Sequence, residues 1–573
     1  MMVPGWRRGC VLIGWAACAA ALAAQPETQP SPADLVIING RVWTGVRGAP
    51  EAAALATRAD RIQAVGSNEQ ITQLIGPATV VIDAQKRRVI PGITDSHTHI
   101  LMGGLELSRI DLRSARSKAD FRDRIAGAVA RLSPGEWLLG GRWTVESWET
   151  PESPARAWID DLTPGTPVYL DRTDGHQVLV NSVALKFARI DADGPPDPPG
   201  GEIVRDPKTG EPTGILKDAA QGLVARHIPD PTVKQSCEAL VAAMRLANRF
   251  GVTAVHDMSQ TSDLPVFAQV HVAGMVTLRI AAYVSVDNWK ENIEKVRGFR
   301  VRDDWLWVAG LKGFMDGSLG SRNAYMREPF SDVGPDAKYP RGMLTATANP
   351  PEKFAAQIAA AVAAGLQPAV HSIGDEANHL LLNLYEKLPA EQRAAIRPRD
   401  EHTQHLLRED IARFAKLGVI ASMQPMHKAD DGRWAEAALG PQRSATTYAF
   451  RSLLDAGATV CFGSDWPVVT IDPFPGIAAA VDARTLDGRV WVPEQRIKRD
   501  EALTAYTVTP AFAAHREKEM GTLEPGKLAD MAILSEDILT VGTECIGQIT
   551  ATHTIVGGRI VWQKPVRSQG GAR

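Results

Sequence analysis

The feature that most constrains the fold is an alternation of short apolar runs, rich in β-branched residues, with alanine-rich stretches of helical character. Examples of the runs are GVTAVHDMS, TLRIAAYVSV, VAGLKGFMDG, LQPAVHSIGD, LGVIASMQP and ATVCFGSDWP. Strands of a parallel sheet that is covered on both faces give such continuous apolar runs. Repeated strand-helix units therefore predict an α/β fold with a closed (β/α)8 TIM-like barrel. A doubly wound open sheet is the alternative that this pattern allows.

Side chains that can bind a metal or move a proton recur at the ends of these predicted strands. They are His97, His99, Lys312, Asp316, His371, His402 and Asp465. Each of them alone has an ordinary structural interpretation, such as a hydrogen-bonded core histidine, a solvated lysine or a turn aspartate. In a closed barrel, however, the carboxyl ends of the strands converge on one cavity, where enzymes of this fold place their catalytic groups. The shared position therefore favours a common site.

The segment PGITDSHTHI, residues 91–100, places two histidines one residue apart. If the segment is extended, its side chains alternate between faces, so Asp95, His97 and His99 point the same way. Two neutral imidazoles side by side suit a metal such as zinc. A surface turn explains an isolated pair equally well, so the pair is informative only together with the downstream residues.

Both ends of the chain have strand character. The stretch LVIINGRVW, residues 35–43, predicts two strands joined at Asn39 and Gly40, a pair typical of hairpin turns. The C-terminal segments DMAILSED and THTIVGGRIVWQ alternate in the same way and turn at glycines. We expect residues 33–90 and 515–565 to form one small β-sandwich.

The barrel is then expected over residues 91–514, with one insertion. Residues from about 140 to 218 are rich in proline, glycine and aspartate, as in DADGPPDPPGGEIVRDPKTGEPTG. This composition is typical of hairpins and loops. We expect the insertion to form a cap over the site.

The first 24 residues resemble a secretory signal peptide. Arg7 and Arg8 precede an apolar segment from Val11 to Ala24 that ends in small residues. A membrane span needs about 20 apolar residues, so this segment is short for one. We expect cleavage after Ala23 or Ala24 and export of the mature protein to the periplasm or the medium, with no membrane span left; a retained anchor is the alternative.

The charge balance and the cysteines limit the partners and the kind of metal site. With 63 basic and 66 acidic residues the formal net charge is −3, which provides no basic surface for nucleic acid. A small-molecule substrate is the expected partner; the sequence allows a homo-oligomer but does not determine the oligomeric state. Removal of the signal peptide would leave Cys237, Cys461 and Cys545, which form neither a disulfide framework nor a zinc-thiolate pattern. Any metal is therefore expected to have nitrogen and oxygen ligands.

Several motifs together resemble the amidohydrolase superfamily, namely PGITDSHTH, HSIGDEA, EHTQ and GSDWPV. The segments GLKGFMDGSLGSRNA, RTDGHQVLVNS, GGEIVRD and TGILKDAA are similar to its amidohydrolase-3 branch, which includes N-substituted formamide deformylases. The C-terminal segment GTLEPGKLADMAIL is similar to the segment through which such chains return to their sandwich domain. The resemblance extends from about Ala33 to Gln563.

This resemblance implies a metal centre of zinc or a similar divalent ion. The implied ligands lie on the first, fifth, sixth and eighth strands of the barrel: His97, His99, His371, His402 and Asp465. Lys312 occupies the place where many relatives carry a carboxylated lysine that bridges two ions. A free ammonium has no lone pair and cannot bind a metal, so two ions require the modification. An unmodified lysine leaves one ion, held by His97, His99, His371 and Asp465.

The implied activity is metal-dependent hydrolysis of the C–N bond of an amide, formamide or cyclic amide. A divalent zinc ion lowers the pKa of the water bound to it to about 7, and it polarises a substrate carbonyl. Asp465 would accept the water proton and pass it to the leaving nitrogen. His176 and His405 are candidates to hold the substrate, with a purely structural hydrogen bond as the alternative for each. Residues expected to orient the ligands or a loop are Asp257, Asp316 and Arg322.

Two other functions stay open at this stage. The same site could hydrolyse an ester or lactone, or deaminate an amidine-like carbon, because activated water attacks all of these centres. The chain could also be a catalytically decayed periplasmic protein that binds a metal or ligand. The complete ligand set and the presence of Asp465, which proton transfer needs more than binding does, disfavour that interpretation.

Overall fold

The structure is a computed structural model that describes residues 31–145, 148–150, 152–172, 177–198, 201–334 and 339–565. The expected signal peptide and His176 lie outside these residues. Within the described part of the chain, no helix is both long and apolar enough to cross a membrane.

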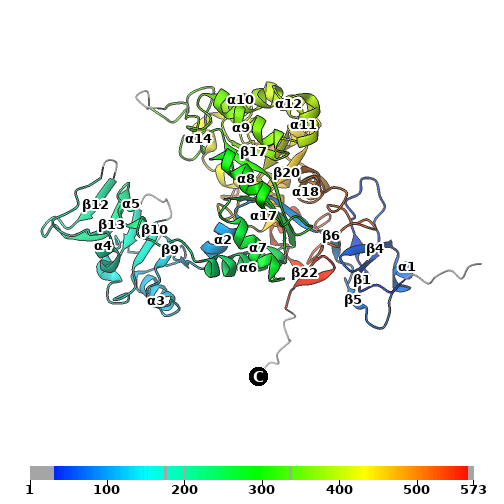
Figure 1. Cartoon of the computed structure of the whole chain (residues 1–573), viewed down its shortest axis with the longest axis horizontal. Helices are drawn as coiled ribbons and strands as arrows, with labels where there is room; N and C mark the ends of the chain where they lie inside the picture. The colour runs from blue at the N-terminus through cyan, green and yellow to red at the C-terminus, as the bar shows by residue number, and fades with distance from the viewer. Residues whose placement is uncertain are drawn as a thin grey trace, which may run out of the picture.

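A sheet of eight parallel strands forms the centre of the molecule (Figure 1). Its strands, in order along the sheet and along the chain, are β7 (Ile93–Thr98), β14 (Val252–Ser259), β15 (Arg279–Ser285), β16 (Leu306–Phe314), β17 (Gln367–Ser372), β18 (Arg399–His402), β19 (Ile420–Met423) and β20 (Val460–Phe462). A parallel bridge between Thr98 and Trp466 brings the two edges together. The strands thus form a nearly closed barrel, as predicted, and not an open doubly wound sheet.

Helices cover the barrel, and most of them contribute side chains to its largest buried core. They are α2 (Ile100–Leu107), α6 (Val233–Arg249), α7 (Leu264–Val272), α8 (Trp289–Gly298), α9 (Pro351–Ala363), α10 (Asp375–Glu386), α11 (Ala390–Ile396), α12 (Ile411–Leu417), α13 (Pro425–Asp431), α14 (Ala435–Leu439), α15 (Pro441–Ser444), α16 (Phe450–Asp455), α17 (Pro473–Asp482), α18 (Arg499–Tyr506) and α19 (Val508–Ala513). Helix α6 illustrates why they form. Thr232 and Gln235 make a capping box at its start, and Leu240, Ala243 and Met244 recur at helical spacing on its buried face.

Both ends of the chain build the sandwich. One sheet has the order β4 (Arg61–Gly66), β3 (Ala54–Arg58), β1 (Leu35–Ile38) and β5 (Val80–Asp83), with α1 (Asn68–Thr72) beside it. The other has the order β2 (Arg41–Val42), β6 (Arg88–Pro91), β21 (Met531–Leu534), β22 (Ala551–Val556) and β23 (Arg559–Gln563). Leu35 and Ile37 share a core with Met531 and Ile533, so the two ends stabilise each other.

The hairpin predicted at Asn39 and Gly40 is wrong. Asn39 does turn the chain, with φ of 54°, but β1 and β2 enter different sheets. Strand β1 is hydrogen-bonded to β3 on one side and to β5 on the other. Both of its edges are therefore occupied, and β2 pairs with β6 instead.

The inserted lobe projects from one side of the barrel in Figure 1. Its sheet has the order β12 (Gly201–Arg205), β13 (Pro212–Asp218), β11 (Gln177–Val180), β10 (Val168–Arg172), β9 (Leu138–Trp143) and β8 (Ile110–Asp111), with helices α3 (Lys118–Val129), α4 (Ser182–Ala188) and α5 (Gln221–Ala225). The lobe has buried cores of its own. The sheet begins at Ile110, well before residue 140. This earlier start was not predicted, because the first half of the sheet lacks the proline- and glycine-rich composition that marked the insertion. Its role as a cap stays a prediction.

A buried ion pair joins the barrel to the sandwich. Arg279 on β15 donates two hydrogen bonds to Asp530, at 2.6 and 2.8 Å. The two side chains are 1% and 5% exposed. Asp530 also accepts the backbone N–H of Gly557 at 2.8 Å. A buried guanidinium that lost this partner would retain the cost of its desolvation.

We therefore predict that Asp530→Asn destabilises the protein by about 3–5 kcal/mol, the usual effect of breaking a buried pair. Urea unfolding followed by circular dichroism measures this. The matched control is Glu291→Gln, which removes an exposed i,i+4 pair with Lys295 and should change stability little. Equal effects of the two substitutions would contradict the structural role of the buried pair.

Candidate metal centre

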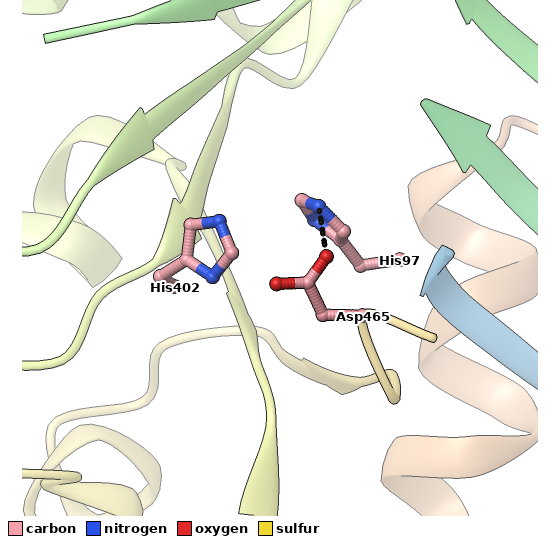
Figure 2. A group of neighbouring side chains, drawn as sticks. All are labelled: His97, His402 and Asp465. Atoms are coloured by element: carbon pink, nitrogen blue, oxygen red, sulfur yellow. Dashed lines mark ion pairs between the residues drawn. The ribbon is translucent and has the colours of Figure 1, made fainter. Parts of the chain in front are cut away.

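The predicted ligands meet at the carboxyl end of the barrel. His97 lies on β7, His402 ends β18, and Asp465 follows β20. Figure 2 shows the Asp465 carboxylate between the two imidazole rings. One ligand atom from each of these three buried residues lies within 4.8 Å of the others.

The distances in this cluster suit a common ion. Asp465 Oδ1 is 3.2 Å from His99 Nε2 and 3.5 Å from His97 Nε2. Ligand atoms about 2.0–2.1 Å from a tetrahedral zinc ion would lie about 3.3 Å apart. The remaining predicted ligands adjoin this group: the His371 and His402 ring centroids are 4.4 Å apart, and Lys312 Nζ is 3.4 Å from His97 Nε2.

Hydrogen bonds leave one ring nitrogen of each histidine free to bind a metal. The Nδ1 atoms face acceptors in three of them: Glu401 Oε2 for His97 at 2.6 Å, Met258 O for His99 at 3.0 Å, and Gln424 Oε1 for His402 at 2.8 Å. A proton on Nδ1 leaves the Nε2 lone pair available. In His371 the roles are exchanged, because Nε2 faces the carbonyl oxygen of Gly317 at 3.3 Å. The donor set therefore fits a divalent ion with nitrogen and oxygen ligands.

Burial keeps these groups in the required charge states. It lowers the pKa of His97 to about 4 and that of His371 to about 3, with the Lys312 charge adding to the effect. Both rings are thus neutral near pH 7. Burial alone would raise the pKa of Asp465, but the facing His97 and His99 rings hold it well below its usual value. Burial also lowers the pKa of Lys312 to about 8.

Glu401 and Arg399 are functional residues that the sequence analysis missed. Both side chains are fully buried. Arg399 donates to Glu401 Oε1 at 2.6 Å, and Glu401 Oε2 accepts the proton of His97 Nδ1. Carboxylates that hold a ligating histidine in this way fix its tautomer and its orientation. The signal was present in RDEH, since residues 399 and 401 share a face of the strand.

A close contact between β7 and the loop after β20 places Asp465. Asp95 accepts the backbone N–H groups of His97 and Ser464, at 3.1 and 2.9 Å. A Cβ atom at Gly463 would lie 2.4 Å from the backbone nitrogen of His97, so only glycine fits there. Asp465 then has φ of 60° and donates its N–H to His97 O at 2.6 Å. A left-handed aspartate is uncommon, and such conformations concentrate at functional sites.

Two predicted orienting residues hold the loops that carry the ligands. Asp257 accepts the N–H of Ile100, the residue after His99. Asp316 accepts three backbone N–H groups, from Tyr325, Ile373 and Gly374, at 2.8 to 3.0 Å, and so fixes the segment after His371.

Arg322, the third residue expected to orient the ligands or a loop, and His405, a candidate to hold the substrate, lie in different surroundings. Arg322 pairs with Asp332 at 3.0 Å and packs on the Trp434 ring. His405 Nδ1 lies 2.9 Å from the Thr447 hydroxyl. Both contacts order loops.

A further histidine was also missed. His427, in MQPMHKADD, has its Nε2 atom 4.0 Å from Asp465 Oδ2. It lies just after β19, the seventh strand, whose end no predicted ligand occupies. That position in the barrel was the signal that could have identified it.

The chain belongs to the amidohydrolase family, whose model matches residues 80–562. This confirms the resemblance that the motifs indicated. Protein LONG AFTER FAR-RED 3 of Arabidopsis thaliana is 37% identical over 88% of this chain and 87% of its own. An N-substituted formamide deformylase of Arthrobacter pascens is 26% identical over 93% of this chain and 98% of its own.

A solved structure agrees with the fold and the class. It is that of an uncharacterized metal-dependent hydrolase from Pyrococcus horikoshii, which is 25% identical and has a TM-score of 0.73. The alignment covers 89% of this chain and 99% of that one. Family, fold and donor set together define this protein as a metal-dependent hydrolase of the amidohydrolase family.

Glu401→Gln should weaken metal binding by about 10- to 100-fold, the usual effect of losing a partner that orients a ligand. The amide retains the size of Glu401 but loses the charge that Arg399 and His97 share. The measurement is competition for the metal by a chelator of known affinity.

The control is Glu409→Gln, which removes an exposed pair with Arg327 and should leave metal affinity unchanged. Unaltered metal affinity in folded Glu401→Gln protein would show that Glu401 does not orient a ligand.

Proposed function

We propose that this protein is an exported hydrolase that cleaves the C–N bond of an amide, formamide or cyclic amide. The observation that carries the proposal is the ionised Asp465 carboxylate, which faces the metal-binding nitrogens of His97 and His99 through one oxygen. The relative named as an N-substituted formamide deformylase supports this bond class. Export rests on the N-terminal segment alone.

The residues have distinct roles in this proposal. One divalent ion, zinc or a similar metal, held by the histidines and Asp465, would supply a water with a pKa near 7 and polarise the substrate carbonyl. Asp465 accepts the proton of the attacking water. It then gives the proton to the leaving nitrogen, acting first as general base and then as general acid.

Lys312 determines whether a second ion binds. Its Nζ atom lies 3.4 Å from His97 Nε2, inside the ligand cluster and not on the outer face of the barrel. Because burial lowers its pKa to about 8, a useful fraction of the lysine is the neutral amine that can add carbon dioxide. A carbamate formed on Lys312 would offer anionic oxygens to two ions. We therefore favour two ions and a carboxylated Lys312.

The function is tested with a panel of N-formyl amines, N-acetyl anilides, lactams, lactones and esters. We expect chelator-sensitive turnover of a formyl or acyl amide. Asp465→Asn should retain metal but lose about 100- to 10,000-fold in kcat, since an amide can donate an oxygen ligand but cannot accept the water proton.

The matched control is Asp472→Asn, which changes the N-cap of α17 to a residue that caps equally well. It should leave kcat unchanged. Turnover of esters alone would move the activity to another bond class, and full activity of Asp465→Asn would remove Asp465 from the reaction.

A further inference from the structure

His427 lies beside the ligand cluster without belonging to it. It is the third residue of α13, which follows β19 directly, and β19 lies between the strands that lead to His402 and Asp465. The His427 side chain is 9% exposed. Its ring is parallel to that of His402, at an interplanar angle of 5° and a centroid separation of 6.3 Å.

One nitrogen of His427 has a partner and the other does not. Nδ1 faces the Gln404 side-chain amide nitrogen at 3.5 Å. Because that NH2 group donates, Nδ1 accepts and the ring proton is on Nε2. Among the described residues, the buried Nε2 has no hydrogen-bond partner. A buried N–H group that lacks a protein partner is costly and calls for an explanation.

The Nε2–H group of His427 faces the ligand cluster. Asp465 Oδ1 faces His97 and His99, whereas Oδ2 faces His427 Nε2 at 4.0 Å. That separation is too long for a hydrogen bond, so the donor is directed at the edge of the ligand cluster and stays free. A protonated nitrogen cannot also bind a metal, so His427 is a donor beside the centre and not one more ligand.

We propose that His427 is a catalytic residue whose Nε2–H group donates a hydrogen bond to the carbonyl oxygen of the substrate. The bond strengthens as that oxygen gains negative charge during attack by water. A fixed donor in a buried site stabilises such charge without having to reorient. This inference rests on the proposed hydrolysis and adds to it the group that recognises the carbonyl oxygen.

The test compares His427→Leu and His427→Asn with wild-type protein loaded with zinc. Loss of one donor of this kind should lower kcat by about 100- to 1000-fold on an amide that the wild type hydrolyses, with little change in KM. The asparagine variant keeps an N–H donor and should recover part of the loss. Zinc content should equal that of the wild type. His553→Gln, on β22 of the sandwich, is the control and should behave as wild type.

A second readout does not depend on turnover. Methylphosphonate resembles the charged tetrahedral centre, whereas acetate resembles a planar product. Calorimetry should show weaker methylphosphonate binding in His427→Leu and unchanged acetate binding, even if no amide on the panel is hydrolysed. Loss of zinc from both variants would make His427 a ligand and overturn the inference. Unchanged methylphosphonate affinity and unchanged kcat would overturn it as well.

Discussion

The site depends on the buried contact between Glu401 and His97. It crosses the barrel from β18 to β7 and gives His97 the tautomer whose Nε2 faces the ligand cluster. Burial of a carboxylate is expensive unless it is paired. Arg399 pairs with this carboxylate and also donates to Ser96 O on β7 at 2.6 Å. The same buried charges that orient His97 therefore also hold β18 and β7 together.

The strand ends that carry predicted ligands also have an unusual backbone conformation. His402 and Asp465 both have left-handed backbones, with φ of 78° and 60°, and each is held by contacts made elsewhere in the barrel. Asp465 presents one oxygen to His97 and His99 and the other to His427. In the proposed reaction, this separation would allow one carboxylate to bind a metal and to move a proton, with the His427 N–H group beside it as a donor for the substrate.

The sequence predicted the barrel and most of the cluster because strand periodicity and ligand-type residues are local signals. His97, His371 and Asp465 each follow an apolar run, and His402 lies in the EHTQ motif, so closure of the barrel was enough to predict that they meet. Pairing partners are not local. Asn39 and Gly40 predicted a hairpin, but both edges of β1 are paired, with β3 and with β5. Glu401 was missed because its role depends on a contact across the barrel with His97, and His427 because its role depends on neighbours that follow the two adjacent strands.

The most direct test of the metal centre is a crystal structure of the zinc-loaded protein, with anomalous diffraction recorded at the zinc edge. We expect one or two zinc peaks among His97, His402 and Asp465. With two peaks, extra density on Lys312 Nζ should bridge ions roughly 3.5–4 Å apart. Active protein with no peak in this cluster, or with zinc bound only elsewhere, would contradict the account.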